Sequence, residues 1–210
     1  MSFEQGLRLV PESSGRDPAD LKVEIEALAD RARQGDSGAF EDLVAATYRR
    51  NYTLARRLTN NEDDARDVTQ EAYLRAYRAI GSFRGESQFT TWMYRITANC
   101  ASSHLGRNRR VLHVPLGHDD EFVDERADSD PSAHVEAMDL RERIGTELAG
   151  LPPKLRAVVV LRDVYELPHE VVAEELGISL SAAKVRLHRA RSKLRSSLYP
   201  HLEEVDSRDV

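Results

Sequence analysis

Helical spacing of apolar residues runs through most of this chain but stops between residues 113 and 131, and this interruption constrains the fold most strongly. The segment holds a proline, a glycine and a single base, Arg126. Its acids are Asp119, Asp120, Glu121, Asp124, Glu125, Asp128 and Asp130. Such a stretch cannot bury enough apolar surface to offset the entropy lost on ordering. The sequence therefore predicts a flexible acidic linker over 111–134 between two separately folded parts.

Two amphipathic helices precede this linker. Apolar residues recur at helical spacing over 40–58 and again over 65–80, with no sustained strand-like alternation. Asn60 and Asn61 between them are good capping residues, and the three acids that follow suit the positive end of a helix. The two helices are expected to pack on each other.

A third helix is expected after a short glycine-flanked loop at residues 82–88. Thr90 or Thr91 is predicted to cap this helix, which runs towards Arg107. Together the three helices predict a compact helical domain over residues 22–110.

Helical periodicity resumes after the linker and predicts a second domain over residues 135–199. Within it, residues 169–188 begin with a short helix, and Gly177 permits the left-handed conformation that ends it. Ile178 and Leu180 are expected to fill the corner before the next helix. This is the pattern of a helix-turn-helix motif.

The second helix of this motif carries a strongly positive local charge. No acid occurs between Ser179 and Leu202, although the whole chain has a net charge of −6. This local charge favours binding to the DNA backbone over a merely solvated surface. The start of such a helix lies in the major groove. Base contacts are therefore expected from Lys184, Val185, His188 and Arg189, and phosphate contacts from Arg186 and Arg191.

Composition excludes several other classes of protein. No apolar run approaches the roughly 20 residues needed to cross a bilayer, so membrane insertion is not expected. Residues 1–21 lack the basic start and apolar stretch of a secretory signal, and they are predicted to form a disordered extension in a cytoplasmic protein. The single cysteine, Cys100, is expected to be a small buried residue. Residues 200–210 form a C-terminal tail.

The second half of the chain resembles region 4 of extracytoplasmic-function sigma factors, which belong to the sigma-70 family. The resemblance lies in residues 151–167 (LPPKLRAVVVLRDVYEL), the helix-turn-helix motif and residues 186–194 (RLHRARSKL). In the first half, residues 67–80 resemble the polymerase-binding helix of the family and residues 83–96 its −10 segment. The matches follow the family's order over most of residues 36–199.

This resemblance implies three contact surfaces. A coiled coil of the polymerase's largest subunit is expected to meet Asp64, Asp67, Gln70, Glu71 and Arg75. The −10 strand, with one base flipped out, is expected to meet Phe83, Arg84, Arg95, Asn99, Arg107, Arg109 and Arg110. The −35 element is expected to be read by the helix-turn-helix motif.

Some of these residues also fit a purely structural role. Glu71 and Arg75 have the spacing of an ion pair within one helix. Phe83 fits the core as well as a base pocket, whereas core packing is favoured for Trp92. The acids of the linker either mimic nucleic acid in the polymerase channel or form a solvated tether.

The sequence thus predicts an all-α protein with two small helical domains, a sigma region 2 bundle and a sigma region 4 helix-turn-helix domain, joined by the flexible acidic linker. It is expected to bind the largest and second-largest subunits of core RNA polymerase, to direct promoter recognition and −10 melting, and to be a target for an anti-sigma factor. The alternative is a helix-turn-helix regulator that binds DNA without polymerase. An enzyme using Asp63, Asp64 and Asp67 as metal ligands is disfavoured because no further ligands accompany them. No catalytic residue, metal or cofactor is expected.

Overall fold

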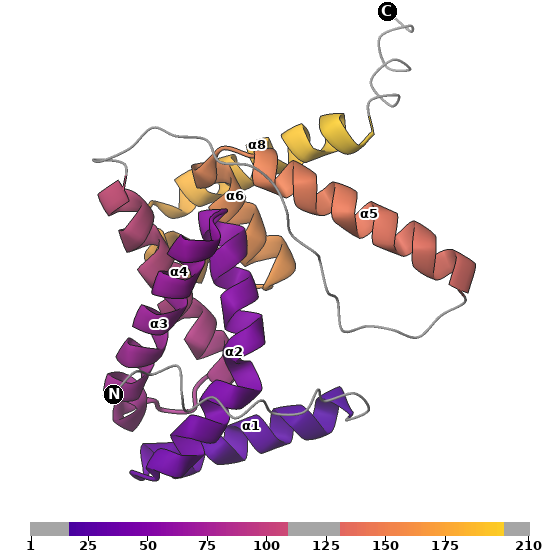
Figure 1. The fold of residues 1–210 in the computed structure, drawn as a ribbon. Coiled ribbons are helices and arrows are strands. Elements are labelled where there is room, and N and C mark those ends of the chain that lie inside the picture. Colours follow the sequence, from indigo (N-terminus) through magenta and orange to yellow (C-terminus); the bar gives the residue numbers. More distant parts are fainter. Residues whose placement is uncertain (1–16, 109–130, 200–210) are drawn as a thin grey trace, which may run out of the picture.

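The structure is a computed structural model that describes residues 17–108 and 131–199 of the 210-residue chain. These residues form helices joined by short turns, and no strand occurs among them, which confirms the predicted all-α class. Figure 1 shows a first group of crossing helices, followed by a second group that begins with the long helix α5. The predicted tail and most of the predicted linker lie outside the described residues.

The first domain contains the helices α1 (Pro18–Arg33), α2 (Ser37–Thr59), α3 (Glu62–Ala79) and α4 (Phe89–Asn108). A 3-10 turn, η2 (Ile80–Ser82), follows α3 and leads into the loop before α4. Helix α2 packs against the other three helices, and α1 crosses one end of the group (Figure 1). This arrangement leaves one side of α3 and of α4 available for contacts outside the domain.

Polar side chains at the helix starts explain where the first three helices begin. Asp17, Asp36 and Asn61 each accept a hydrogen bond from a backbone N–H in the following turn, at distances of 2.8, 3.0 and 2.9 Å. Asn60 adopts the left-handed conformation, with φ at 57°, and ends α2. The predicted capping role of Asn60 and Asn61 is confirmed.

Helix α1 begins earlier than the sequence indicates. Residues 18–21, assigned from the sequence to a disordered extension, are helical. Pro18 stands at the first helical position, where its missing N–H costs nothing, and Asp17 caps the helix just before it. The remainder of the predicted extension, residues 1–16, lies outside the described residues.

Helix α4 also begins earlier than predicted. It starts at Phe89, so capping by Thr90 or Thr91 is wrong. The Phe89 N–H donates to Glu26 Oε1 of α1 at 2.9 Å, and this carboxylate takes the role that a local cap would have had. A partner distant in the sequence therefore sets the start of this helix.

A buried polar network joins α2, α3 and α4. The Tyr73 hydroxyl lies 2.9 Å from Thr47 Oγ1 and accepts a hydrogen bond from Asn51 Nδ2 at 2.8 Å. Thr97 Oγ1, which donates to the Met93 carbonyl at 2.9 Å, lies 3.5 Å from Asn51 Oδ1. All four side chains are buried, and desolvation raises the pKa of Tyr73 well above its ordinary value. Because buried polar groups need partners, this network fixes how the three helices are rotated against one another.

Replacing Tyr73 with phenylalanine should lower the free energy of unfolding by about 1 to 2 kcal/mol, because the buried Asn51 and Thr47 each lose a partner. Urea unfolding of the full chain, followed by circular dichroism, measures this change. Tyr77→Phe is the matched control, since Tyr77 lies on the same helix and is 56% exposed. Equal effects of the two substitutions would contradict a stabilising role for the network.

The second domain contains the helices α5 (Pro131–Gly150), α6 (Pro153–Val159), α7 (His169–Glu175) and α8 (Leu180–Leu198). A π-helical turn, η3 (Val160–Val164), extends α6. Helix α8 packs against α5, α6 and α7. It is therefore the central helix of this domain, and its remaining face is open to solvent.

Helices α7 and α8 form the predicted helix-turn-helix motif. Gly177 has the expected positive φ of 59°, and Ser179 Oγ accepts from the Ala182 N–H at 3.2 Å at the start of α8. Ala183, Leu187 and Ala190 are buried, as predicted, whereas Leu194 and Leu198 are only half-buried. Leu180, which was expected to fill the corner before this helix, is instead 38% exposed, and Ile178 is half-buried. The register of α8 is otherwise the one inferred from the sequence.

The two domains pack against each other, α2 against α6 and α4 against α7. The rings of Tyr94 and Tyr165 meet edge to face, with centroids 4.7 Å apart. Arg57 Nη1 donates to the Tyr165 hydroxyl at 3.5 Å, and Arg156 Nη2 donates to the Leu58 carbonyl at 3.4 Å. The sequence predicts two domains but gives no sign of this contact between them.

Candidate polymerase and nucleic-acid interfaces

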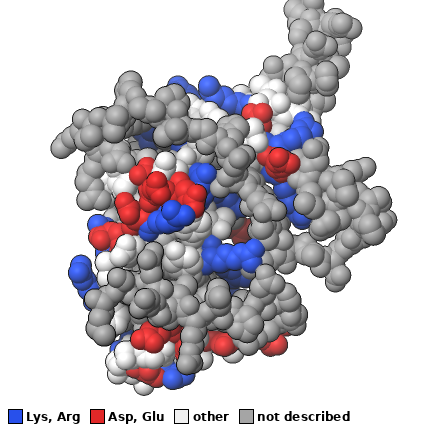
Figure 2. All heavy atoms as spheres, in the orientation of Figure 1, with Lys and Arg blue, Asp and Glu red and all other residues white. Residues whose placement is uncertain are grey.

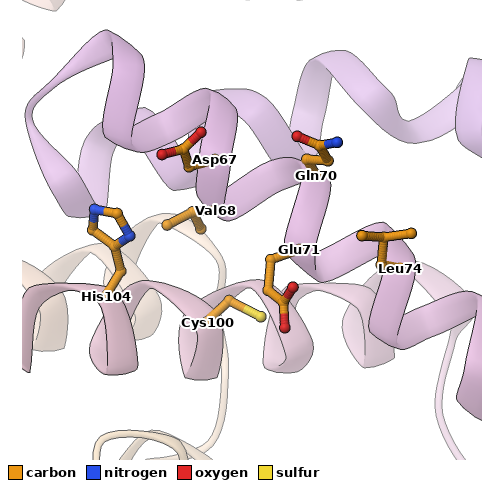
Figure 3. Close-up of a pocket in the computed structure, with 7 residues that line it drawn as sticks. All are labelled: Asp67, Val68, Gln70, Glu71, Leu74, Cys100 and His104. Carbon is orange, nitrogen blue, oxygen red and sulfur yellow. The ribbon is translucent and has the colours of Figure 1, made fainter. Parts of the chain in front are cut away.

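A groove of about 380 Å³ lies between α3 and α4 on the surface of the first domain. Figure 3 shows Asp67, Gln70 and Leu74 of α3 along one side, with Cys100 and His104 of α4 on the other. Asp67 and Gln70 are exposed, and Leu74 is 39% exposed although it is apolar. The groove thus has a mixed polar and apolar border, as protein surfaces commonly do.

The five residues predicted to face core polymerase do not form one uniform surface. Asp64 is half-buried, and its Oδ1 lies 2.8 Å from His104 Nε2. Arg75 Nε donates to Glu71 Oε1 at 2.7 Å, and this bond raises the pKa of Arg75. Glu71 and Arg75 thus form the expected ion pair within one helix. Asp67 and Gln70 remain as the exposed members of the set.

Acidic side chains gather over the first half of α3 (Figure 2). Arg66 pairs with Glu62 and, at 3.2 Å, with Asp63, so part of this charge is neutralised within the helix. Asp67 has no ion-pair partner among the residues that the structure describes, and it is exposed. Its carboxylate is therefore well placed to accept hydrogen bonds from a basic partner.

A second groove, of about 330 Å³, contains residues predicted for the −10 surface. It is lined by Arg75 and Ala79 of α3, by Trp92, Arg95, Ile96 and Asn99 of α4, and by Glu175 of α7. Arg75 Nη1 donates to Asn99 Oδ1 at 3.1 Å, so a predicted polymerase contact lies directly beside a predicted DNA contact. The groove combines polar groups that can bond a base edge with the half-buried ring of Trp92. This ring packs against Phe83 and Phe89, with centroids 5.1 and 5.7 Å away, as the favoured core role predicts.

Arg95 is held by the second domain. Its Nε donates to Glu175 Oε1 at 2.9 Å, and its Nη2 donates to Glu174 Oε2 at 3.0 Å. Glu175 is only 12% exposed, whereas Glu174 is 68% exposed. In this conformation the guanidinium group faces carboxylates rather than a phosphate.

Phe83 and Arg84, adjacent in the loop before α4, have different environments. Phe83 is 6% exposed, with its ring 5.1 Å from Trp92 and 6.0 Å from Phe89, so the core alternative describes this conformation. Arg84 is exposed, with Glu86 3.8 Å away. Contact between Phe83 and a base stays a prediction, and it requires the loop to rearrange.

Helix α8 presents the basic surface predicted for −35 DNA. Lys184, Val185, His188 and Arg189 are exposed, and Arg186 is half-buried. Arg191 donates from Nε and Nη2 to the two carboxylate oxygens of Asp163 at 2.8 and 2.6 Å, which raises the pKa of Arg191. Its predicted phosphate contact therefore requires this ion pair to be exchanged.

Several residues that line the grooves were not identified from the sequence, among them Leu74, Ala79, His104 and Glu175. His104 lies four residues after Cys100, so helical spacing could have placed both on one face. Glu175 lies beside Arg95 although the two are 80 residues apart, and no local pattern indicates that contact. Of the other predicted −10 residues, Arg107 lies in the last turn of α4, and Arg109 and Arg110 fall outside the described residues.

No group of three or more His, Cys, Asp or Glu side chains that could hold a metal ion occurs within residues 17–108 and 131–199. Across the same residues, no helix has the length and apolar character needed to span a membrane.

Comparison with known proteins identifies both domains. The chain matches the family models for sigma-70 region 2 over residues 43–111 and sigma-70 region 4 over residues 141–194. It is 33% identical over 186 residues to the RNA polymerase sigma-H factor of Pseudomonas aeruginosa, covering 86% of this chain and 96% of that protein. It is 30% identical over 184 residues to the ECF RNA polymerase sigma factor SigW of Bacillus subtilis, covering 85% and 98%.

The fold is also similar to that of CnrH, solved in complex with the cytosolic domain of CnrY. The TM-score is 0.54 at 26% identity, and the match covers 85% of this chain and 99% of that one. These similarities extend over both helical domains and nearly the whole length of the relatives. The chain belongs to the extracytoplasmic-function sigma factors of the sigma-70 family.

Proposed function

We propose that this chain acts as an alternative sigma factor whose first domain binds core RNA polymerase through the exposed side of α3. One observation supports the proposal: a single chain carries both an acidic helix with an exposed side and a basic helix-turn-helix motif. Asp67 and Gln70 are exposed beside the apolar Leu74. A basic coiled-coil surface on the largest polymerase subunit fits this combination of carboxylate, amide and apolar side chain.

The same domain contacts the −10 element through the groove around Asn99. Arg75, Arg95 and Asn99 supply donors and an acceptor there, and Trp92 supplies an aromatic surface. A base flipped out of the non-template strand needs both kinds of contact. Arg84 is exposed in the adjoining loop and contributes a further positive charge.

The second domain anchors the complex at the −35 element through α8. Lys184, Val185, His188 and Arg189 are exposed along the first half of the helix, from which a recognition helix meets base edges. Arg186 and Arg191 contact the flanking phosphates, which carry affinity without sequence information.

Promoter-dependent transcription with purified core polymerase tests this function. Initiation at a promoter is expected only when the chain is added. Tight binding to promoter DNA by the chain alone, with no stimulation of core polymerase, would instead support a helix-turn-helix regulator.

Asn99→Ala is expected to slow open-complex formation about fivefold while leaving the initial closed complex with polymerase unchanged, because base capture acts only after unpairing. Potassium permanganate footprinting on a duplex promoter measures the opened strand. A promoter with a premelted −10 region is a useful control, since its opening step is already complete. Normal opening by the variant on duplex DNA would remove Asn99 from the proposed pocket.

The remaining expectations follow from this role. The chain acts in the cytoplasm, where polymerase and promoter DNA are found, and it catalyses no reaction itself. It also contacts the second-largest polymerase subunit. An anti-sigma factor is a further proposed partner, which is supported by the similarity to CnrH, solved in complex with the cytosolic domain of CnrY.

A further inference from the structure

The loop before α4 is anchored at both ends by hydrogen bonds. At its start, the Phe83 N–H donates to the Ile80 carbonyl of η2 at 3.0 Å. At its end, the Phe89 N–H donates to Glu26 Oε1 of α1 at 2.9 Å. Gly85 turns the chain between these points, with φ at 71°, a conformation that side chains disfavour. The path of the loop therefore depends on both anchors.

The second anchor takes the place of a local helix cap. The Gln88 carbonyl accepts the first hydrogen bond of α4, from the Trp92 N–H at 3.0 Å, so Gln88 occupies the N-cap position. Glutamine is not one of the residues favoured there. Glu26 instead brings a carboxylate to the Phe89 N–H from 63 residues away, and its negative charge suits the positive end of α4. The start of α4 thus depends on α1.

The anchored residue belongs to an aromatic cluster that borders the proposed −10 groove. Phe89 is fully buried, and its ring lies 6.0 Å from that of Phe83 and 5.7 Å from that of Trp92. Trp92 lines the groove together with Asn99. Without Glu26, the Phe89 N–H would lack its acceptor at a residue that has no exposed surface, so the first turn of α4 would have to shift. Such a shift moves the loop and one wall of the groove together.

Helix α1 contacts the elements on both sides of this loop. It crosses one end of the first group of helices (Figure 1), and it packs against η2, which precedes the loop, and against α4, which follows it. Ile25, Leu28 and Ala29 are buried, and they fix the helix around the half-buried Glu26. The match to sigma-70 region 2 begins at residue 43, after α1 has ended. The contact of Glu26 with α4 therefore comes from a helix outside the matched region.

We propose that Glu26 is a positioning residue for promoter opening. By accepting the Phe89 N–H, it fixes the first turn of α4, and with it the loop and the wall of the groove that receive the flipped −10 base. Glu26 acts through α4 and does not itself contact DNA. Its role in opening rests on the proposed function, whereas the anchoring of the loop does not.

Hydrogen exchange of the Phe89 amide, measured by NMR on the full chain without DNA or polymerase, tests the anchor directly. In Glu26→Ala this amide should exchange about tenfold faster than in the wild type, because it loses its acceptor. Glu26→Gln should retain the protection, since a carboxamide oxygen also accepts a hydrogen bond. Glu26→Asp keeps the charge but is one methylene shorter, so it should restore only part of the protection.

Glu24→Ala is the matched control. Glu24 is an exposed glutamate of the same helix, so the substitution removes the same side chain and charge two residues away from the anchor. This variant should exchange like the wild type at Phe89. Urea unfolding of every variant separates a local loss of protection from a general loss of stability. If Glu26→Ala fails to fold, the comparison of Glu26→Gln with Glu26→Asp still tests the hydrogen bond.

With core polymerase and a duplex promoter, Glu26→Ala should slow open-complex formation about threefold and leave the closed complex unchanged, because the loop must be repositioned before it can hold an unpaired base. Glu26→Gln should open the promoter like the wild type. Wild-type exchange of the Phe89 amide in Glu26→Ala and Glu26→Asp would overturn the anchor. Faster exchange with normal opening would overturn the role in opening. A wild-type chain that supports no promoter-dependent transcription would overturn the proposed function and that role, and leave the anchor standing.

Discussion

Reversing the charge at Asp67 to lysine is expected to weaken the affinity for core RNA polymerase at least 30-fold, or about 2 kcal/mol. The carboxylate is exposed beside a groove and has no ion-pair partner in the described part of the chain, so it contributes little to the fold. In the complex, the substitution replaces an attraction to a basic partner with a repulsion between like charges. Competition between labelled wild type and unlabelled variant for core polymerase measures the change.

Glu41→Lys serves as the control for this experiment. Glu41 is an exposed acid of α2 in the same domain, so the net charge changes by the same amount away from the groove. Circular dichroism should show equal helical content for both variants and the wild type. If Asp67→Lys binds core polymerase as tightly as Glu41→Lys does, the proposed polymerase surface on α3 is misplaced.

The second large effect is expected on the choice of −35 bases, through substitutions in α8. Lys184→Ala and Arg189→Ala should each change the preferred −35 bases, because a good contact to a base edge contributes about 1 to 3 kcal/mol of discrimination. Both side chains are exposed on α8, near its start and middle. Binding of each variant polymerase holoenzyme to a panel of single-base −35 changes measures the preference.

Arg191→Ala should behave differently from these two variants. A phosphate contact releases counterions without reading a base, so binding should weaken across all sequences and the dependence on salt should fall. The loss is expected to be the smaller one, because Arg191 must first leave its bidentate pairing with Asp163. Measuring the affinity of each variant for the panel of −35 sequences at two salt concentrations distinguishes a change in base preference from a uniform loss of affinity.

A reversed result would identify an error in the placement of α8. If Arg191→Ala alters the base preference while Lys184→Ala and Arg189→Ala leave it intact, the helix is rotated in the groove relative to the proposal. Lys193→Ala gives a reference for the loss of a positive charge, since Lys193 is exposed on the same helix.

The local structure of this chain was largely predictable because it depends on neighbours within one helical turn. Asn60 and Asn61 separate α2 from α3 through their own backbone conformation and side chain. Gly177 marks the turn before α8 through its positive φ. Apolar spacing gave the buried side of α8 correctly, and the exposed basic side followed from it.

The sites were predictable only as sets of residues on a helix face. The spacing of Glu71 and Arg75 indicated their ion pair, and the structure contains it. The spacing alone could not show that Arg75 also donates a hydrogen bond to Asn99 on α4, because that bond depends on how the two helices pack. Phe83 illustrates the same limit, since its aromatic ring suited either the core or a base pocket and packing placed it in the core.

The sequence alone determined the all-α class, the capping at Asn60 and Asn61, the helix-turn-helix motif and the charge carried by each helix, because these depend on residue type and on short, regular spacing. Only the tertiary structure decided which charges meet. Glu26 accepts a hydrogen bond from the start of α4, 63 residues away in the sequence. Asp163 pairs with Arg191, 28 residues away, and Glu175 pairs with Arg95, 80 residues away. Each of these contacts joins helices that are far apart in the sequence. Its position follows from the packing of helices and domains, which no local pattern in the chain encodes.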